Sequence, residues 1–436
     1  MKKTFLHKTI YGAGESVSVT GITVIGLYFL YFLTDVVGLT PALAGSIFMI
    51  GRAWDAISDP IVGYVSDQTK TKWGRRRPYF MAASFPLLVL FLFLWYPVGF
   101  TTQWSLFLYY SLIYVLFMTS LTLFHVPYIS LITEYSTDYD ERTSINNYRI
   151  FFQLFVGLMA ATIPKLIADQ YGYQQMGLYV GFFIAIVAIF IFTFTRENRI
   201  IQKKRQKTIF KELKSVFQNR PMRYLLWIYV GSYAAANIIE SFVIYYMKYY
   251  LNREIDMPIL FVVVIGTGIL TLPLWAVISK QIGKRHTLLI GLFLWIFGQV
   301  GWLVISPSSA PFVVYVIGVI VGAGYGVAHV LPWAMLPDVV DVDEWETGEK
   351  REGIYAGIMT FFMKMANSIA IFFIGIILEL SGYIANTTQS ETTLRTIKWT
   401  MAIAPGMFII VAIIATFLYP FTKEKHMEIR SQLEQN

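Results

Sequence analysis

The sequence contains no cysteine, and only 14% of its side chains are charged. The missing cysteine excludes disulfide scaffolds, cysteine-ligated zinc, iron–sulfur clusters and thiol nucleophiles. The low charge excludes an ordinary soluble enzyme and a disordered chain, because soluble domains carry about 25% charged residues. The motifs of P-loop ATP binding, of zinc peptidases and of serine hydrolases are also absent. We therefore expect neither an enzyme nor an ATP-driven pump, and no cofactor.

Apolar residues are abundant, at 56% of 436 positions. Crossing a hydrocarbon core takes about 20 of them in one helix. Uncharged stretches suited to one helix each occur at 16–34, 170–195, 257–279 and 399–422, and two longer ones, 79–133 and 286–337, suit hairpins turning at Pro97 and Ser306. Helices that tolerate charge near 41–65, 147–166, 224–247 and 353–378 bring the number to twelve. The sequence thus predicts an all-α polytopic membrane protein.

The two long hairpins begin 207 residues apart, and matching landmarks follow each. His125 and Pro127 precede one acidic run, and His329 and Pro332 precede another. Two related six-helix halves are typical of secondary transporters. We expect an N-terminal bundle at 1–195, a cytoplasmic linker at 196–223 and a C-terminal bundle with a short tail at 224–436.

Basic residues are strongly biased to one side of these twelve spans. The side that holds both termini carries 28 of the 35 Lys and Arg, which predicts cytoplasmic termini in the cell membrane. Ten of them lie in 196–223, so the net charge of +8 reflects topology and not nucleic-acid binding. Helical spacing of apolar residues in this linker predicts an amphipathic helix on anionic membrane lipid, with a regulatory partner site as the alternative. A polar start before a full-length span argues against a cleaved signal peptide.

The second helix carries the densest charge in the apolar part of the chain, from Arg52 to Asp59. Asp55 and Asp59 are four residues apart and share one helix face with Ser58. Two stacked carboxylates suit a desolvated alkali cation such as Na⁺ or a shared proton. The alternative is structural: Arg52 neutralises Asp55, and Asp59 caps a helix that breaks before Pro60.

Lys364 lies in the middle of the eleventh span and needs an anionic neighbour. The Asp55 and Asp59 carboxylates are the most economical candidates, with snorkelling as the alternative. His125 and His329 occupy matching places in the two halves and suit either structural hydrogen bonds or contact with a substrate or proton.

A basic loop joins the second and third helices. Asp67 follows Gly63 at the helix end and precedes Arg75, Arg76 and Arg77. This arrangement favours a gate that latches onto the acidic runs near 134–141 and 338–352 in one conformation. Retention of loops in the cytoplasm explains the basic residues equally well.

These residues carry a family likeness along the whole chain. The chain resembles the major facilitator superfamily, specifically the glycoside–pentoside–hexuronide:cation symporters typified by the melibiose carrier. The supporting stretches are Tyr11-Gly12, Thr34-Asp35-Val36-Val37-Gly38-Leu39, Arg52-Ala53-Trp54-Asp55-Ala56-Ile57-Ser58-Asp59-Pro60, Trp73-Gly74, Asp140-Glu141-Arg142, Asn237-Ile238-Ile239, and Lys364 ahead of Gly382-Tyr383.

The resemblance implies a fold of two six-helix bundles and a set of site residues. Cation binding falls to Asp55, Asp59, Ser58 and Thr122, with Na⁺ or H⁺ as the coupling ion. Substrate binding and coupling fall to Glu15, His125, Tyr128, Arg149, Asn237 and Lys364. The charge pattern of the loops, and not the resemblance, gives the gating candidates Asp67, Arg75, Arg76, Arg77, Arg142 and Arg351.

The sequence also departs from the family pattern. Ser58 stands where the melibiose carrier has asparagine, and Val19 and His125 stand where it has two sugar-binding aspartates. We expect a monomeric, cation-coupled symporter of a sugar or glycoside. The alternative is a lysolipid or other amphiphile carrier, because animal lysolipid symporters share the run around Val126-Pro127-Tyr128. A polytopic enzyme is a distant third.

Overall fold

The computed structural model describes residues 5–135, 139–195, 216–348 and 351–421, with the single positions 429 and 432. Within these ranges the side chains of residues 133–140, 142 and 143 are not described. The described part is helical, apart from turns and an isolated bridge between Thr71 and Gly74. Contacts divide the chain into two compact units, each considered by itself. Unit 1 comprises Met1–Lys203, Phe372–Glu379 and Ile384–Thr387, and unit 2 comprises Lys204–Ile371, Leu380–Tyr383 and Thr388–Asn436.

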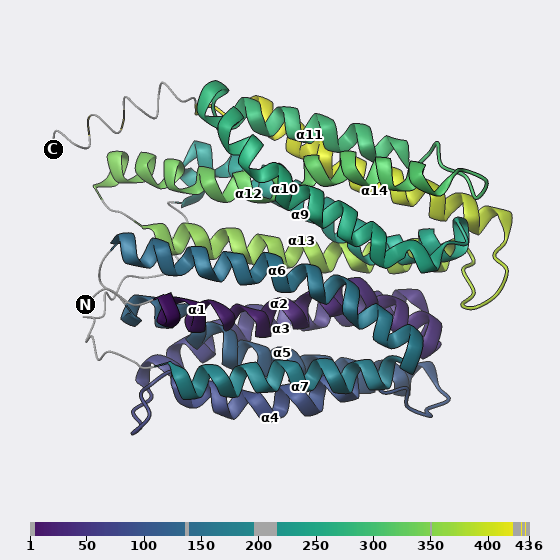
Figure 1. The fold of residues 1–436 in the computed structure, drawn as a ribbon, viewed down its shortest axis with the longest axis horizontal. Coiled ribbons are helices and arrows are strands. Elements are labelled where there is room, and N and C mark those ends of the chain that lie inside the picture. Colours follow the sequence, from purple (N-terminus) through teal and green to yellow (C-terminus); the bar gives the residue numbers. More distant parts are fainter. Residues whose placement is uncertain are drawn as a thin grey trace. The chain divides into compact units, whose positions relative to one another are not determined.

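Unit 1 contains the helices of the first half of the chain (Figure 1). They are α1 (Phe5–Ala13), α2 (Glu15–Val24), the π-helical segments η1 (Ile25–Phe29) and η2 (Phe32–Val36), α3 (Pro41–Gln68), α4 (Arg77–Leu94), α5 (Gln103–Tyr135), α6 (Tyr139–Tyr171) and α7 (Tyr173–Phe194).

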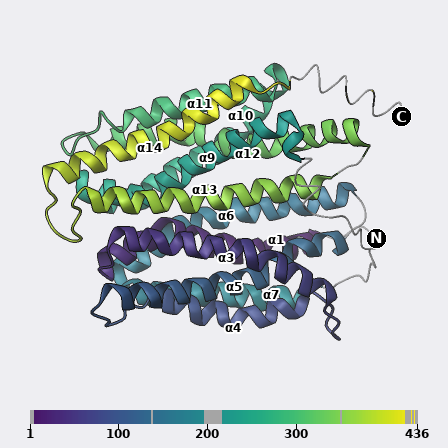
Figure 2. The same cartoon turned by 180° about the vertical axis from the view of Figure 1, so that it is seen from behind.

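Unit 2 contains most of the second half (Figure 2). Its elements are α9 (Arg220–Tyr245), the π-helical segment η3 (Tyr246–Tyr250), the short 3₁₀ segment η4 (Glu254–Asp256), α10 (Met257–Ile282), α11 (Lys284–Gly301), α12 (Pro311–Thr347), α13 (Glu352–Leu380) and α14 (Glu391–Leu418). Residues 372–379 of α13 are counted with unit 1.

Ten helices in the described part of the chain are long and apolar enough to cross a membrane. Two further long helices, α3 and α11, fall short of that hydropathy. α3 carries Arg52, Asp55 and Asp59 in its middle, and α11 begins with Lys284 and Arg285. These charged residues lower the mean hydropathy of both helices.

The expected helices and hairpin turns correspond closely to the observed ones. Pro97 lies between α4 and α5, and Ser306 lies between α11 and α12. The start of the chain differs, because helix begins at Phe5 and not near residue 16. Packing explains this: α1 lies against α6, and an added Cβ on Gly12 would meet the backbone of Tyr148 at 2.9 Å. Residues 196–215, which hold most of the expected linker helix, lie outside the described residues.

Packing inside each unit follows the same plan, as the internal duplication predicts. In unit 1, α3 packs on α5, and α4 packs on α5 and α7. In unit 2, α10 packs on α12, and α11 packs on α12 and α14. The first and seventh spans also both end in π-helical turns, η1 and η2 in one and η3 in the other.

Glycines at 322, 324 and 326 allow α12 to lie close to its neighbours. An ideal Cβ on Gly322 would lie 2.3 Å from the carbonyl oxygen of Val264 in α10. A Cβ on Gly324 would lie 2.6 Å from the backbone nitrogen of Trp295 in α11. These neighbours are backbone atoms, which cannot rotate away, so small residues bring the helices together.

We expect Gly322→Ala to lower the free energy of unfolding by about 1–3 kcal/mol, because the added methyl group collides with backbone. Gly266→Ala in α10 is the matched control, since no atom lies within 4 Å of its added Cβ. Thermal unfolding of the two detergent-purified variants compares them. Equal melting temperatures would contradict close packing at Gly322.

Candidate functional site

The charged stretch of α3 is buried inside unit 1. Nη1 of Arg52 lies 3.2 Å from Oδ2 of Asp55, and the Asp55 side chain is 1% exposed. Arg52 also lies within electrostatic reach of Asp59. α3 continues through Pro60 to Gln68, so Asp59 does not cap a broken helix. The Arg52–Asp55 ion pair of the structural interpretation is present, whereas the helix break is not.

Side chains from α3 and α5 bring oxygen atoms to the same region. Thr122 of α5 donates from Oγ1 to Oδ1 of Asp59 at 2.9 Å. The buried hydroxyl of Ser58 makes no hydrogen bond with any described residue. The structure therefore brings Thr122 to Asp59, as the family resemblance implies.

Tyr114 of α5 belongs to this cluster and is missed by the sequence analysis. Its ring lies so close to Gly51 that an added Cβ would meet it at 2.1 Å. The phenol lies within electrostatic reach of Arg52 and Asp55, and its buried oxygen has no hydrogen-bond partner among the described residues. Gly51, one residue before Arg52, is the sequence signal for such a close approach.

Among the described residues, no three His, Cys, Asp or Glu side chains come together in a way that could hold a metal ion. Asp55 and Asp59 supply two carboxylates from one helix. An alkali cation here would need hydroxyl or carbonyl oxygens to complete its shell, and Ser58, Thr122 and Tyr114 carry hydroxyls of this kind.

A second polar cluster in unit 1 joins α2 to α6. Nε of Arg149 lies 3.3 Å from Oε2 of Glu15, and these side chains are 22% and 9% exposed. Tyr11 and Tyr128 clasp each other beside them. The Tyr11 hydroxyl donates to the Tyr128 carbonyl at 3.0 Å, and the Tyr128 hydroxyl donates to the Tyr11 carbonyl at 2.7 Å. Their rings stack at 4.9 Å.

Tyr128 is held on both sides by these contacts, and its role toward a substrate stays a prediction. Tyr128 is completely buried, and an added Cβ on Gly14 would meet its ring at 2.4 Å. His125, one turn earlier on α5, is half-buried, and its Nδ1 lies 2.7 Å from Oγ of Ser18. Ser18, next to Val19, is the partner that the sequence analysis does not anticipate.

Lys364 and Asn237 lie in unit 2, on α13 and α9, and both are half-buried. Asn237 donates from Nδ2 to the carbonyl of Tyr233 at 2.7 Å. Asp55 and Asp59 lie in unit 1, so pairing of Lys364 with these carboxylates stays a prediction.

The basic loop after α3 has partners within unit 1. Nη2 of Arg76 lies 3.2 Å from Oδ1 of Asp67. Arg77 donates from Nη2 to the carbonyl of Phe192 at 2.6 Å, near the end of α7. Arg75 lies half-buried in the same loop. Arg142 lies on α6, but its side chain is outside the description.

Unit 2 repeats the Arg77 contact. Arg285 at the start of α11 donates from Nε to the carbonyl of Thr416 at 3.1 Å and from Nη2 to that of Phe417, at the end of α14. A guanidinium near a helix C-terminus donates to carbonyls that have no partner within the helix. Its positive charge also interacts favourably with the negative end of the helix dipole. The two arginines therefore fasten matching helices in the two units.

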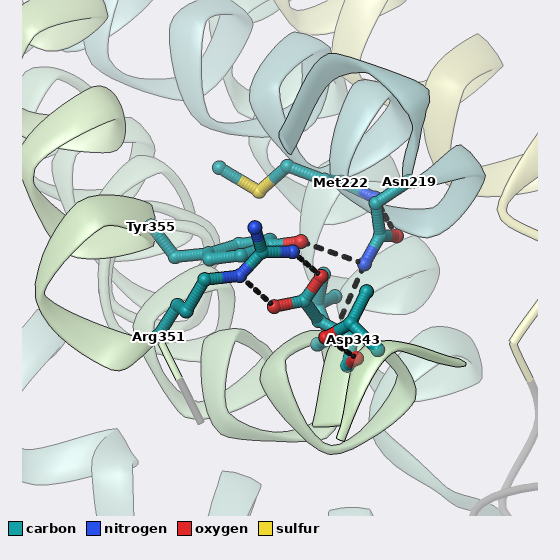
Figure 3. A network of polar contacts seen from close by, with 7 residues as sticks. Asn219, Met222, Asp343, Arg351 and Tyr355 are labelled. Atoms are coloured by element: carbon teal, nitrogen blue, oxygen red, sulfur yellow. Dashed lines mark hydrogen bonds and ion pairs between the residues drawn. The ribbon is translucent and has the colours of Figure 1, made fainter. Parts of the chain in front are cut away.

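Arg351 is part of a polar network at the ends of α9, α12 and α13 (Figure 3). It donates from Nε to Oδ2 of Asp343 at 2.8 Å and makes a second bond from Nη2 to Oδ1. Asn219 accepts from the Met222 backbone at 3.2 Å as the N-cap of α9 and donates to the Tyr355 hydroxyl at 3.0 Å. Arg351 thus has an acidic partner inside its own unit.

Asp338, in the same acidic run, has a partner on α11. Nζ of Lys284 lies 2.8 and 2.7 Å from its two carboxylate oxygens. The expected latch joined this run to the basic loop at 66–78. In the structure, Asp338 and Asp343 each pair with a basic residue of unit 2.

Comparison with known proteins identifies the family. The family described as "MFS/sugar transport protein" matches residues 10–423. The chain belongs to this family. It is similar to the glucuronide carrier protein homolog of Escherichia coli, with 28% identity, covering 97% of this chain and 94% of the relative. It is also similar to the sodium-dependent lysophosphatidylcholine symporter 1-A of Danio rerio, with 25% identity, covering 97% of this chain and 86% of the relative.

Solved structures show the same fold. The crystal structure of a D-xylose-proton symporter matches with a TM-score of 0.69 and 13% identity, covering 96% of this chain and 98% of that chain. The expected major facilitator fold is therefore confirmed, as is the family resemblance. The MFS/sugar transport protein described here is a multi-pass membrane transporter and not an enzyme.

We expect Asp343→Asn to destabilise the transporter by about 3–5 kcal/mol, because it removes one charge of a largely buried ion pair. The Arg351 and Asp343 side chains are 10% and 3% exposed. Arg395→Gln is the control, because Arg395 and Glu391 form an exposed pair, worth about 0–1 kcal/mol. Thermal unfolding in detergent measures both. If Asp343→Asn unfolds no earlier than the control, the network is not a structural tie.

Proposed function

We propose that this MFS protein is a secondary active symporter that couples Na⁺ or H⁺ to the transport of a sugar or glycoside. The observation that carries the proposal is the buried carboxylate pair of α3, with the hydroxyl of Thr122 on Asp59. Charged groups inside membrane helices are expensive and are kept where they are paired or used. The family match and the similarity to the glucuronide carrier homolog support the choice of a sugar.

The carboxylates and hydroxyls of this cluster suit a single monovalent cation or a proton. Asp55 and Asp59 are four residues apart on α3, and Arg52 lies beside Asp55. We propose Asp55, Asp59, Ser58 and Thr122 as the cation ligands. We propose that Tyr114 holds the Arg52 side chain in position.

We propose that the substrate contacts the polar clusters of both halves. Arg149 supplies a hydrogen-bond donor and Glu15 an acceptor beside Tyr11 and Tyr128. His125 supplies a ring nitrogen beside Ser18. Tyr128 acts through Tyr11, because its ring and hydroxyl are buried. Lys364 and Asn237 are the proposed contacts of the second half.

Alternating access would move the six-helix halves, 1–195 and 224–436, about the substrate, with 196–223 as a linker on membrane lipid. The ion pairs of Asp67 with Arg76 and of Asp343 with Arg351 are proposed to break and re-form, with Arg75, Arg77 and Arg142 completing the gate. The bias of basic residues supports cytoplasmic termini in the cell membrane. We propose that the monomer is the transporting unit.

A second function is supported by one comparison. The similarity to the lysophosphatidylcholine symporter of Danio rerio extends over 97% of this chain. An amphiphile would therefore be carried by the same fold, with the same cation cluster and a different substrate surface.

Uptake into proteoliposomes tests the proposal. We expect radiolabelled methyl galactosides, xylosides or glucuronides to accumulate under an imposed Na⁺ or pH gradient. Asp55→Asn and Asp59→Asn are expected to abolish accumulation, because each removes a charge that holds the cation. Glu391→Gln is the control, as Glu391 is exposed.

Undiminished gradient-driven uptake in both aspartate variants would overturn the cation site. Accumulation of lysophosphatidylcholine, together with no uptake of any sugar, would transfer the proposal to the amphiphile.

A further inference from the structure

Helices α9 and α12 of unit 2 meet along a ladder of aromatic side chains. The rings of Tyr229 and Trp333 lie 5.4 Å apart, edge to face, and those of Tyr233 and His329 lie 4.0 Å apart. Residue numbers rise along one helix as they fall along the other, so the helices are antiparallel. Tyr325 extends the ladder by a further turn and lies 4.9 Å from His329.

The two sides of this ladder differ in exposure. Tyr229 and Tyr233 of α9 are buried. On α12, Tyr325 and His329 are half-buried and Trp333 is 37% exposed. The α12 rings therefore rest on the α9 rings and keep part of their surface accessible.

Hydrogen bonds fix the rings in place. Nε1 of Trp333 donates to the Tyr233 hydroxyl at 3.1 Å, and that hydroxyl donates to the His329 carbonyl at 3.4 Å. The Tyr229 hydroxyl lies 3.3 Å from Sδ of Met363 on α13. Side chains held in this way lose little rotamer freedom when a ligand packs on them, which favours binding.

A carboxylate lies at the next position of the ladder. Glu240 is seven residues after Tyr233, so both occupy one face of α9. The Glu240 side chain lies within electrostatic reach of the phenols of Tyr233 and Tyr325. Glu240 is half-buried, and the described part of the chain supplies it with neither an ion pair nor a hydrogen bond. A carboxylate in an apolar span without a structural partner is a candidate for ligand binding.

We propose that Glu240 and the α12 rings form a substrate-binding surface for a neutral glycoside, which rests on the sugar symport proposed above. Tyr325, His329 and Trp333 follow each other at every fourth residue, a row of about 12 Å at 1.5 Å per residue. A row of rings suits the flat apolar faces of an extended glycoside, whereas an ammonium group prefers faces that surround it. Glu240 accepts hydrogen bonds from the sugar hydroxyls and repels an anionic sugar.

The test measures uptake of p-nitrophenyl α-galactoside, α-xyloside and β-glucuronide by the full chain in proteoliposomes. We expect Glu240→Gln to raise KM for the neutral glycosides about tenfold or more, the size of one lost hydrogen bond to a charged acceptor. KM for the glucuronide should change less, because Glu240→Gln also removes the repulsion between Glu240 and the carboxylate of the glucuronide. The half-saturating cation concentration should stay within twofold, and Glu240→Asp should restore part of the affinity.

Tyr325 supplies a second, independent variant. Tyr325→Phe keeps the ring and should leave KM for the neutral glycosides within about threefold, whereas Tyr325→Leu removes the ring and should raise KM. Glu391→Gln controls for loss of a carboxylate at an exposed position. Chromatographic elution as a single monodisperse peak identifies the variants that fold.

Three outcomes overturn the inference. One is an unchanged KM in Glu240→Gln. Another is loss of gradient-driven accumulation while sugar exchange without a gradient keeps its KM, which would make Glu240 a proton carrier. The third is binding of tetramethylammonium that is tighter than binding of glycosides and is lost in Glu240→Gln, which would indicate a cation site. Absence of sugar uptake by the unmodified chain would overturn the proposed function itself, and not Glu240 alone.

Discussion

The cost of a charge inside hydrocarbon is the constraint on which this structure depends. An arginine, lysine or aspartate at the centre of a membrane helix costs about 2.5–3.5 kcal/mol on insertion scales. The transporter meets this cost by local pairing. Inside the spans the pairs are Arg52 with Asp55 and Glu15 with Arg149. Nearer the helix ends, Lys165 pairs with Asp169, Lys284 with Asp338 and Arg351 with Asp343. Each pair lies within one unit.

Local pairing has a consequence for transport. A pair such as Arg52 with Asp55 can move with its unit as a body, so its charges stay compensated when the two halves of a transporter rearrange. We propose that Asp59 responds to the binding of a cation and Glu240 to the binding of a sugar.

Duplication is visible in particular contacts as well as in helix order. Arg77 and Arg285 occupy equivalent positions, and each donates to carbonyls near the end of the last helix of its half. Neither contact was expected, because a helix-terminal carbonyl carries no signature in the sequence. The basic residues were assigned to gating from charge pattern alone, which does not distinguish a latch from a helix cap.

Most of the fold could be predicted because hydropathy and turn residues act locally. Uncharged stretches and the turns at Pro97 and Ser306 determined the helices, and Asp55 with Asp59 followed from charge in an apolar span. Tyr114, Ser18 and the α9–α12 ring ladder could not be found in this way. Each depends on a contact between helices far apart in the sequence, and apolar periodicity leaves many aromatic positions equivalent.

The sequence by itself determined that this chain spans a membrane, that its halves are related and which few charges lie among apolar residues. Only the tertiary structure decided which groups meet. It decided that Arg52 faces Asp55, that Thr122 reaches Asp59, that Tyr128 is buried against Tyr11, and that Glu240 lies beyond a row of rings. The physical reason is that burial of apolar side chains is non-directional, so the composition of a segment is enough to predict it. A hydrogen bond or an ion pair instead requires two particular atoms at about 3 Å.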